Sequence, residues 1–317
     1  MCAGSSDVPA DVFDDVLATV RDFVRNRVVP RELEIVASDA IPDDLRQQEA
    51  EMALFGDAIP QDWGGLGLDL VQLAMELGYT SLAVRSMFGT NSGIAGQVLV
   101  GFRTDAQKQQ WLPRLAEGDV ASFALTEPGA GSDPAGLRTT ATRDGDDWII
   151  SGPALVGDER TGYRAAMTSL ARGRIHIEAL AVGSAQRALD ESVSYAATAT
   201  QGGTPIGDFQ LVQAMLADQQ TGVMAGRALV REAARLYVTG EDQRIAPSVA
   251  KLFCTEMVGK VADPTVQVHG GTGPRRQVTA PPRRHAAAGR SPPRSGWRPA
   301  LSPSSHAADR DRGAPRR

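Results

Sequence analysis

Apolar residues recur at helical spacing through most of the first 118 positions of this chain. After Asp11 they return every three or four residues until Pro30, which is typical of one face of an amphipathic helix that a proline ends. The same spacing predicts further helices over residues 69–78, 92–102 and 105–115. The glycine-dense segment 60–68 predicts a loop. We therefore expect a helical N-terminal domain over residues 1–118.

The pattern changes period after residue 118. Residues 139–142 and 147–151 have the composition of short strands, and Asp144-Gly145-Asp146 between them suits a hairpin turn. Two or three strands with open edges are marginally stable alone. Residues 119–163 are thus too short to form an independent β domain.

Helical spacing then returns in three long segments, which are residues 174–196, 208–238 and 247–268. Long helices joined by short connections are typical of an antiparallel bundle. The segment 164–273 is therefore expected to form a C-terminal helical bundle, and the fold class is expected to be mainly α.

Composition narrows the class of protein. Apolar residues make up 42% of the 317 residues and charged residues 22%, as in ordinary globular proteins. No stretch approaches the run of about 18 apolar residues that a membrane helix needs, so no membrane partner is expected. The widely spaced Cys2 and Cys254 exclude a disulfide scaffold, and the four histidines lack metal-ligand spacing. With no secretory signal at the N-terminus, we expect a cytoplasmic protein.

Residues 274–317 differ from the rest. They hold eleven arginines against two aspartates, a net charge of about +9 in a chain whose total is −5. They are also rich in proline and poor in large apolar residues, which predicts disorder. A basic tail of this kind is a generic electrostatic footprint, but apart from Trp297 it lacks the interleaved aromatic residues of a single-strand binder. Nucleic acid is therefore not the expected partner.

A glycine-rich turn is the most distinctive motif. Residues 123–133 have the sequence Phe-Ala-Leu-Thr-Glu-Pro-Gly-Ala-Gly-Ser-Asp. A strand that leaves into such a turn lets backbone N–H groups approach an anion, although glycine spacing alone also fits a tight turn without a ligand. No helix opens directly after it, so it is not the Rossmann fingerprint.

The whole string resembles the first signature of the acyl-CoA dehydrogenase family. This resemblance implies that Leu125 and Thr126 face the isoalloxazine ring of FAD. It also implies that Gly131 and Ser132 lie near the FAD pyrophosphate and the acyl-CoA substrate.

A second segment, Gln267-Val268-His269-Gly270-Gly271, is similar to the family's second FAD site, which is reached from the neighbouring subunit. A helix that ends in Gly-Gly can also be a simple C-cap. The flavin interpretation is favoured because this segment and the other matching segments follow one another in the family's order. By the same resemblance, Gln210 lies near that flavin and Arg174 contacts the substrate. Electron-transfer flavoprotein is then the implied electron acceptor.

Three departures from the family pattern stand out. Most of the family's middle β-barrel is missing between residues 155 and 164, so residues 119–163 are a remnant of it. The family's Tyr-Glu-Gly-Thr motif, whose glutamate abstracts the α-proton of the thioester, has no counterpart, because residues 274–317 contain no glutamate. An arginine that contacts FAD is replaced by Ala199, which is expected to cost about 1.5–3 kcal/mol of binding energy.

The switch to arginine and proline after Gly273 suggests a reading-frame change, a hypothesis that the nucleotide sequence would test. Some family members place the base on the first bundle helix, where this chain has Gly173. Glu178 lies five residues later and is a weak candidate for a surrogate base, since it faces about 140° away on a helix.

Three functional interpretations remain open. The chain is an impaired acyl-CoA dehydrogenase-like flavoprotein, a non-catalytic subunit that partners an intact paralogue, or an electrostatic binder that acts through its tail. A homo-oligomer or a hetero-oligomer is expected for the first two.

Overall fold

The computed structural model describes residues 9–68, 70–122, 126–127, 129–131, 138–145, 147–151 and 162–272. The predictions for the tail 274–317, for Leu125 and for Ser132 fall outside these residues. In the described ranges no helix is both long and apolar enough to cross a membrane.

The N-terminal part is helical, as the spacing of apolar residues predicts. Its helices and helical turns are α1 (Ala10–Phe23), η1 (Val24–Val28), η2 (Val29–Arg31), α2 (Glu32–Ser38), α3 (Asp43–Glu51), η3 (Leu54–Gly56), η4 (Gln61–Trp63), α4 (Leu70–Leu77), α5 (Leu82–Gly89), η5 (Asn91–Gly96), α6 (Gln97–Phe102) and α7 (Asp105–Ala116). Local chemistry fixes several boundaries. Thr104 and Gln107 form a capping box at the start of α7, in which each side chain accepts a hydrogen bond from the other residue's backbone N–H.

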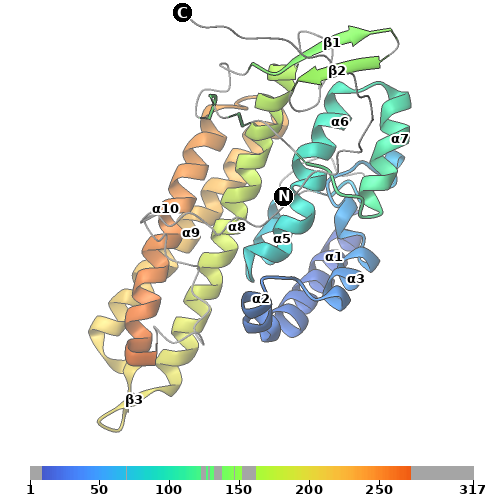
Figure 1. Cartoon of the computed structure of the whole chain (residues 1–317). Helices are drawn as coiled ribbons and strands as arrows, with labels where there is room; N and C mark the ends of the chain where they lie inside the picture. Colours follow the sequence, from blue (N-terminus) through green and yellow to red (C-terminus); the bar gives the residue numbers. More distant parts are fainter. Residues whose placement is uncertain are drawn as a thin grey trace, which may run out of the picture. The chain divides into compact units, whose positions relative to one another are not determined.

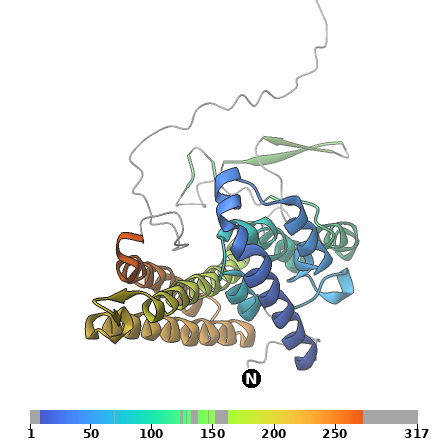
Figure 2. The same cartoon turned by 90° about the horizontal axis from the view of Figure 1, so that it is seen from below.

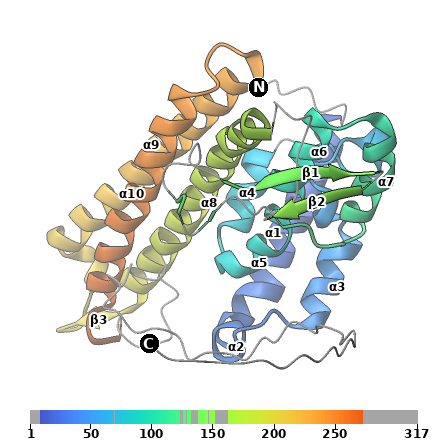
Figure 3. The same cartoon turned by 45° about the horizontal axis from the view of Figure 1, so that its top comes forward.

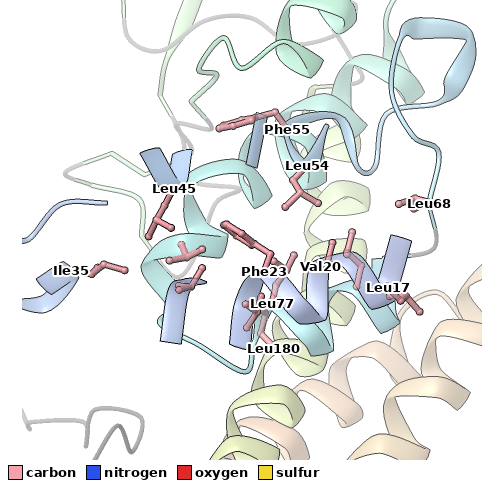
Figure 4. Close-up of a cluster of buried hydrophobic side chains, with 14 residues drawn as sticks. Leu17, Val20, Phe23, Ile35, Leu45, Leu54, Phe55, Leu68, Leu77 and Leu180 are labelled. Carbon is pink, nitrogen blue, oxygen red and sulfur yellow. The ribbon is translucent and has the colours of Figure 1, made fainter. Parts of the chain in front are cut away.

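The apolar faces of these helices form one core. Leu17, Val20 and Phe23 of α1 meet Leu73 and Leu77 of α4 in a buried cluster (Figure 4). Leu180, which lies far away in the sequence, belongs to the same cluster. The core therefore joins the N-terminal helices to the first helix of the bundle.

The predicted β-hairpin is confirmed. Strands β1 (Thr140–Asp144) and β2 (Asp147–Ser151) pair antiparallel, with Thr140 opposite Ser151 (Figure 3). Gly145 at the turn has a φ of 62°, which glycine adopts without steric cost.

Three long helices form the C-terminal bundle, and they run side by side in Figures 1 and 2. They are α8 (Gly162–Thr198), α9 (Gln210–Thr239) and α10 (Ile245–His269). The predicted start of the first helix, residue 174, is wrong by twelve residues. Residues 162–173 contain alanines that favour a helix, but two glycines and weak apolar spacing hide the pattern.

The connection between α8 and α9 contains a small hairpin that apolar spacing does not predict. Strands β3 (Thr200–Gln201) and β4 (Thr204–Pro205) pair antiparallel, and the turn η7 (Ile206–Asp208) follows them. Gly202 and Gly203 have φ values of 60° and 85°. Two consecutive positive φ angles are what a two-residue hairpin turn of the primed type requires.

A glycine contact fixes the N-terminal helices to the bundle. A Cβ atom on Gly183 of α8 would collide with the carbonyl oxygen of Met75 on α4, and one on Gly78 would collide with the backbone of Leu180. The hydroxyl of Ser184 donates a 2.9 Å hydrogen bond to the carbonyl of Gly78. The two segments therefore touch backbone to backbone, which only glycine permits here.

Candidate functional site

One end of the bundle gathers four of the predicted site residues. Gln210 is the first residue of α9, and Gln267 lies in the last turn of α10. Gly270 and Gly271 follow in the turn η8 (Gly270–Thr272). Because α9 and α10 run antiparallel, these residues come to the same end of the bundle, where α8 also ends.

Their surroundings are open. Both glutamines and both glycines are exposed, and a Cβ atom on either glycine would meet nothing within 4 Å. Gly270 has a φ of 55°, a conformation that L side chains rarely adopt. In the described part of the chain, neither glutamine side chain makes a hydrogen bond. The bundle end thus offers the side-chain amides of Gln210 and Gln267 for hydrogen bonding, together with an accessible backbone at Gly270 and Gly271.

A pair of rings supports this end. The rings of Tyr195 on α8 and His269 on α10 stack with centroids 4.4 Å apart. The Nδ1 atom of His269 lies 2.8 Å from the carbonyl oxygen of Thr265, and the hydroxyl of Thr272 donates to the Tyr195 hydroxyl at 3.4 Å. Sequence reasoning missed Tyr195, because two rings on separate helices give no local signal of their contact.

Glu127, a described residue of the glycine-rich segment, makes contacts that no local sequence pattern predicts. Glu127 accepts hydrogen bonds from the backbone N–H groups of Arg138 and Thr139, at 2.9 and 2.8 Å, and from the Thr139 hydroxyl. These bonds, led by that of Thr139, lower the pKa of Glu127. The turn is thereby tied to the start of β1. Thr126 and Gly131 are both exposed beside it.

The substrate-side residues lie far from the bundle end. Arg174 donates a 3.4 Å hydrogen bond to the hydroxyl of Ser248, at the start of α10. Tyr195 lies 21 residues later on α8, a separation of about 30 Å at the rise of an α-helix. The chain therefore does not bring Arg174 and the Gly270–Gly271 segment to one ligand of ordinary size.

Glu178 is fully buried in the bundle, beside the apolar residues of α8 and α10. Neither of its carboxylate oxygens has a hydrogen-bond partner among the described residues. Burial raises the pKa of Glu178 to about 9, and burial together with this carboxyl raises the pKa of Cys254 to about 12. At neutral pH the Glu178 carboxyl is protonated and has no capacity to accept a proton.

Gly173 faces η5. A Cβ atom placed on it would lie 3.7 Å from Cγ1 of Ile94, an ordinary van der Waals distance.

The neighbouring interior is polar, since Arg85 donates to Nδ1 of buried His176 at 3.1 Å and Ser92 donates to buried Asp57. Burial, aided by Arg85, holds the pKa of His176 well below 6.5, so this imidazole is neutral. No sequence pattern predicts this cluster, because its members come from separate segments of the chain.

Two models of one protein family match the chain. The N-terminal domain of acyl-CoA dehydrogenases matches residues 13–119, and their C-terminal domain matches residues 160–288. This chain belongs to the acyl-CoA dehydrogenase family. The second match extends fifteen residues past the border at residue 273 that the sequence pattern predicts.

Individual acyl-CoA dehydrogenase relatives agree. The chain is 28% identical to the probable acyl-CoA dehydrogenase YngJ of Bacillus subtilis, over 80% of this chain and 86% of that protein. It is 27% identical to CarC, a subunit of the caffeyl-CoA reductase-Etf complex of Acetobacterium woodii, over the same shares. The structure of glutaryl-CoA dehydrogenase from Mycobacterium smegmatis superposes with a TM-score of 0.75 at 26% identity, covering 85% and 87% of the two chains.

Proposed function

We propose that this chain binds FAD and an acyl-CoA thioester but does not catalyse α,β-desaturation. The observation that carries the proposal is the state of α8. Gly173 occupies the position where some family members carry the base, and the nearest later carboxylate, Glu178, is buried and protonated at neutral pH. Removal of an α-proton needs an ionised carboxylate within hydrogen-bond reach of the substrate carbon.

The exposed residues at the bundle end fit a dinucleotide. The accessible backbone at Gly270 and Gly271 and the uncommitted amides of Gln210 and Gln267 are suited to phosphate and ribose oxygens. FAD, when bound, supplies a hydride acceptor. The roughly 30 Å between Arg174 and this end favours an arrangement in which a second chain contributes the Gly270–Gly271 segment.

The shortened middle domain is part of the proposal. The alignment with YngJ has 328 positions but uses 80% of 317 residues, or about 254, so about 74 positions have no residue in this chain. A loss of this size fits the single described hairpin, β1 with β2, between the two helical parts. We infer that the flavin ring is less shielded from water than in the relatives.

The test begins with the purified full chain. We expect the absorption bands of oxidised flavin after incubation with FAD, and no desaturation of any acyl-CoA. Turnover by the wild-type chain that Glu178→Gln abolishes would identify Glu178 as the base and overturn the proposal.

A gain-of-function variant sharpens this test. Gly173→Glu combined with Ile94→Ala places a carboxylate on the face of α8 toward η5 and removes the side chain it would meet. We expect a low but measurable rate from the double variant and none from Ile94→Ala alone. A flavin-loaded double variant that stays inactive would show that the missing base is not the sole defect.

A second candidate is a non-catalytic subunit. Helices α9 and α10 expose several large apolar side chains, namely Leu211, Met224, Val238, Ile245, Val249 and Leu252. Exposed apolar surface of this extent favours association with another chain. Sedimentation of the protein alone and with an intact paralogue would separate a homo-oligomer from a hetero-oligomer. Because CarC is a subunit of an Etf complex, the same sedimentation experiment should also be run with electron-transfer flavoprotein.

A further inference from the structure

A hollow of about 300 Å³ that is rich in arginine is lined by residues of α1, η1, α4, α8 and α9, together with Tyr79 just after α4. Its four guanidinium groups belong to Arg21, Arg25, Arg227 and Arg231. The carboxylates in the lining are Glu76 and Asp190, so the lining carries a net charge of +2. An excess of positive charge in a concave site attracts anions.

The two carboxylates are already engaged. Glu76 pairs with Arg21 at 2.7 Å and lies 3.9 Å from Arg25. Asp190 accepts hydrogen bonds from the neutral groups of Tyr79 and Gln186, each at 2.8 Å. Glu76 therefore neutralises part of the charge of Arg21 and Arg25, whereas no described contact joins Asp190 to an arginine of α9.

Among the described residues, the two arginines of α9 that line the hollow have no carboxylate partner. Arg227 donates from Nη2 to the neutral amide oxygen of Gln186 at 2.8 Å, and its buried Nε has no hydrogen-bond partner within the described ranges. Arg231 lies one helical turn later on the same face, and the described residues offer it no ion pair. A buried N–H group without a partner is costly, and a ligand oxygen would satisfy it.

We propose that this hollow binds a phosphate dianion, either free or carried by a small metabolite. Guanidinium groups match phosphate oxygens with paired hydrogen bonds, and the two charges of the dianion balance the net charge of the lining. A volume of about 300 Å³ is at the lower end of small-molecule pockets, so it holds a phosphate with a few further atoms. Arg227 lies 17 residues along α9 from Gln210, about 25 Å, so the hollow is separate from the proposed dinucleotide site.

Calorimetric titration of the full chain at constant ionic strength tests this site with inorganic phosphate, ribose 5-phosphate and ribose. We expect binding of the phosphate-containing probes and none of ribose. Tighter binding of ribose 5-phosphate than of phosphate would identify a phosphorylated metabolite, and the reverse would identify the free ion.

Variants on one helix supply the control. Arg227→Gln and Arg231→Gln should each weaken binding by roughly tenfold or more. Arg235→Gln, on the same helix, removes a charge already paired with Glu232 and Glu241 at 2.8 Å and should change affinity less than about twofold. Glu76→Gln should tighten binding, because it frees Arg21.

Two results would overturn the site. One is the absence of phosphate binding to the wild-type chain. The other is an equal loss in Arg235→Gln and Arg231→Gln, which would indicate non-specific attraction only. If an arginine variant fails to fold, the direction of the Glu76→Gln effect still decides, since weaker binding there contradicts the proposal.

Discussion

Two parts of α8 lie in different surroundings. In the stretch from Gly173 to Gly183, His176 and Glu178 are buried and α4 touches the backbone at Gly183. At the C-terminal end of α8, which we call the open end, Tyr195 lies beside an exposed turn whose glycines have free space around them. The buried stretch therefore holds its imidazole and its carboxyl as neutral groups, whereas the open end leaves backbone and side-chain amides accessible.

Under the proposed function, this difference separates binding from catalysis. The open end keeps groups that suit a ligand or a second chain, whereas the buried stretch, where the family resemblance implies a base in some members, has a glycine and a protonated acid. Mutations in the buried stretch should therefore act on stability, and those at the open end should act on binding.

The largest effect is expected at the glycine contact between α4 and α8. Gly183→Ala would place a Cβ atom against the carbonyl oxygen of Met75, so the helices would have to separate. We expect a loss of about 3 kcal/mol in the free energy of unfolding, at the upper end of overpacking effects. Denaturant titration measures it.

The same substitution at Gly259 is the matched control. Gly259 is exposed within α10, and a Cβ atom there would meet nothing within 4 Å. Gly259→Ala should stabilise the chain by about 0.5–1 kcal/mol through helix propensity. Equal effects of the two variants would contradict the backbone contact.

The buried acid predicts a pH dependence. The pKa of Glu178 rises from an ordinary 4.5 to about 9 on folding, so between these values the folded chain binds one more proton than the unfolded chain. Stability from this group is complete below pH 4.5 and falls as the pH rises towards 9, by about 1.4 kcal/mol per pH unit. Buried Glu49, with a pKa raised to about 8, acts in the same direction.

Glu178→Gln removes this titration and keeps the shape of the side chain. We expect the decline in stability from pH 6 to pH 8 to shrink by about 2.7 kcal/mol. Glu256→Gln, at an exposed position on α10, should leave the slope unchanged. An unaltered slope in Glu178→Gln would mean that the buried carboxyl is ionised and has found a partner.

Sequence reasoning succeeded where the signal was local. Apolar spacing located α1, α4, α6, α7 and most of the bundle helices but not α2, α3 or α5, and Asp144-Gly145-Asp146 located the β1–β2 turn. It failed where the deciding contact lies far away in the chain, as for Gly183 against Met75 and Arg85 against His176. No local pattern states which glycine will meet a carbonyl oxygen or which arginine will be buried. The predicted roles of Thr126, Gly131 and Arg174 stay predictions.

At the open end, Gly270→Ala tests the turn after α10. The φ of Gly270, 55°, is strained for any residue with a Cβ atom, so we expect a loss of about 1 kcal/mol in stability. Gly271→Ala, without a positive φ, should cost little stability. If FAD approaches this backbone, both variants should weaken FAD binding in a flavin titration. An effect on stability alone would confine the segment to a helix cap.

The smallest effect is expected at the ring pair. Tyr195→Leu removes the 4.4 Å stack on His269 and should cost about 0.5–1.5 kcal/mol, whereas Tyr195→Phe keeps the ring and loses a single exposed hydrogen bond from Thr272. The thermal unfolding temperature of Tyr195→Phe should therefore be close to that of the wild type, and that of Tyr195→Leu should be lower. Because the stack joins the ends of α8 and α10, Tyr195→Leu should also loosen the Gly270–Gly271 turn, which amide hydrogen exchange at Gly271 would report. Unchanged exchange would mean that the turn holds its shape without the rings.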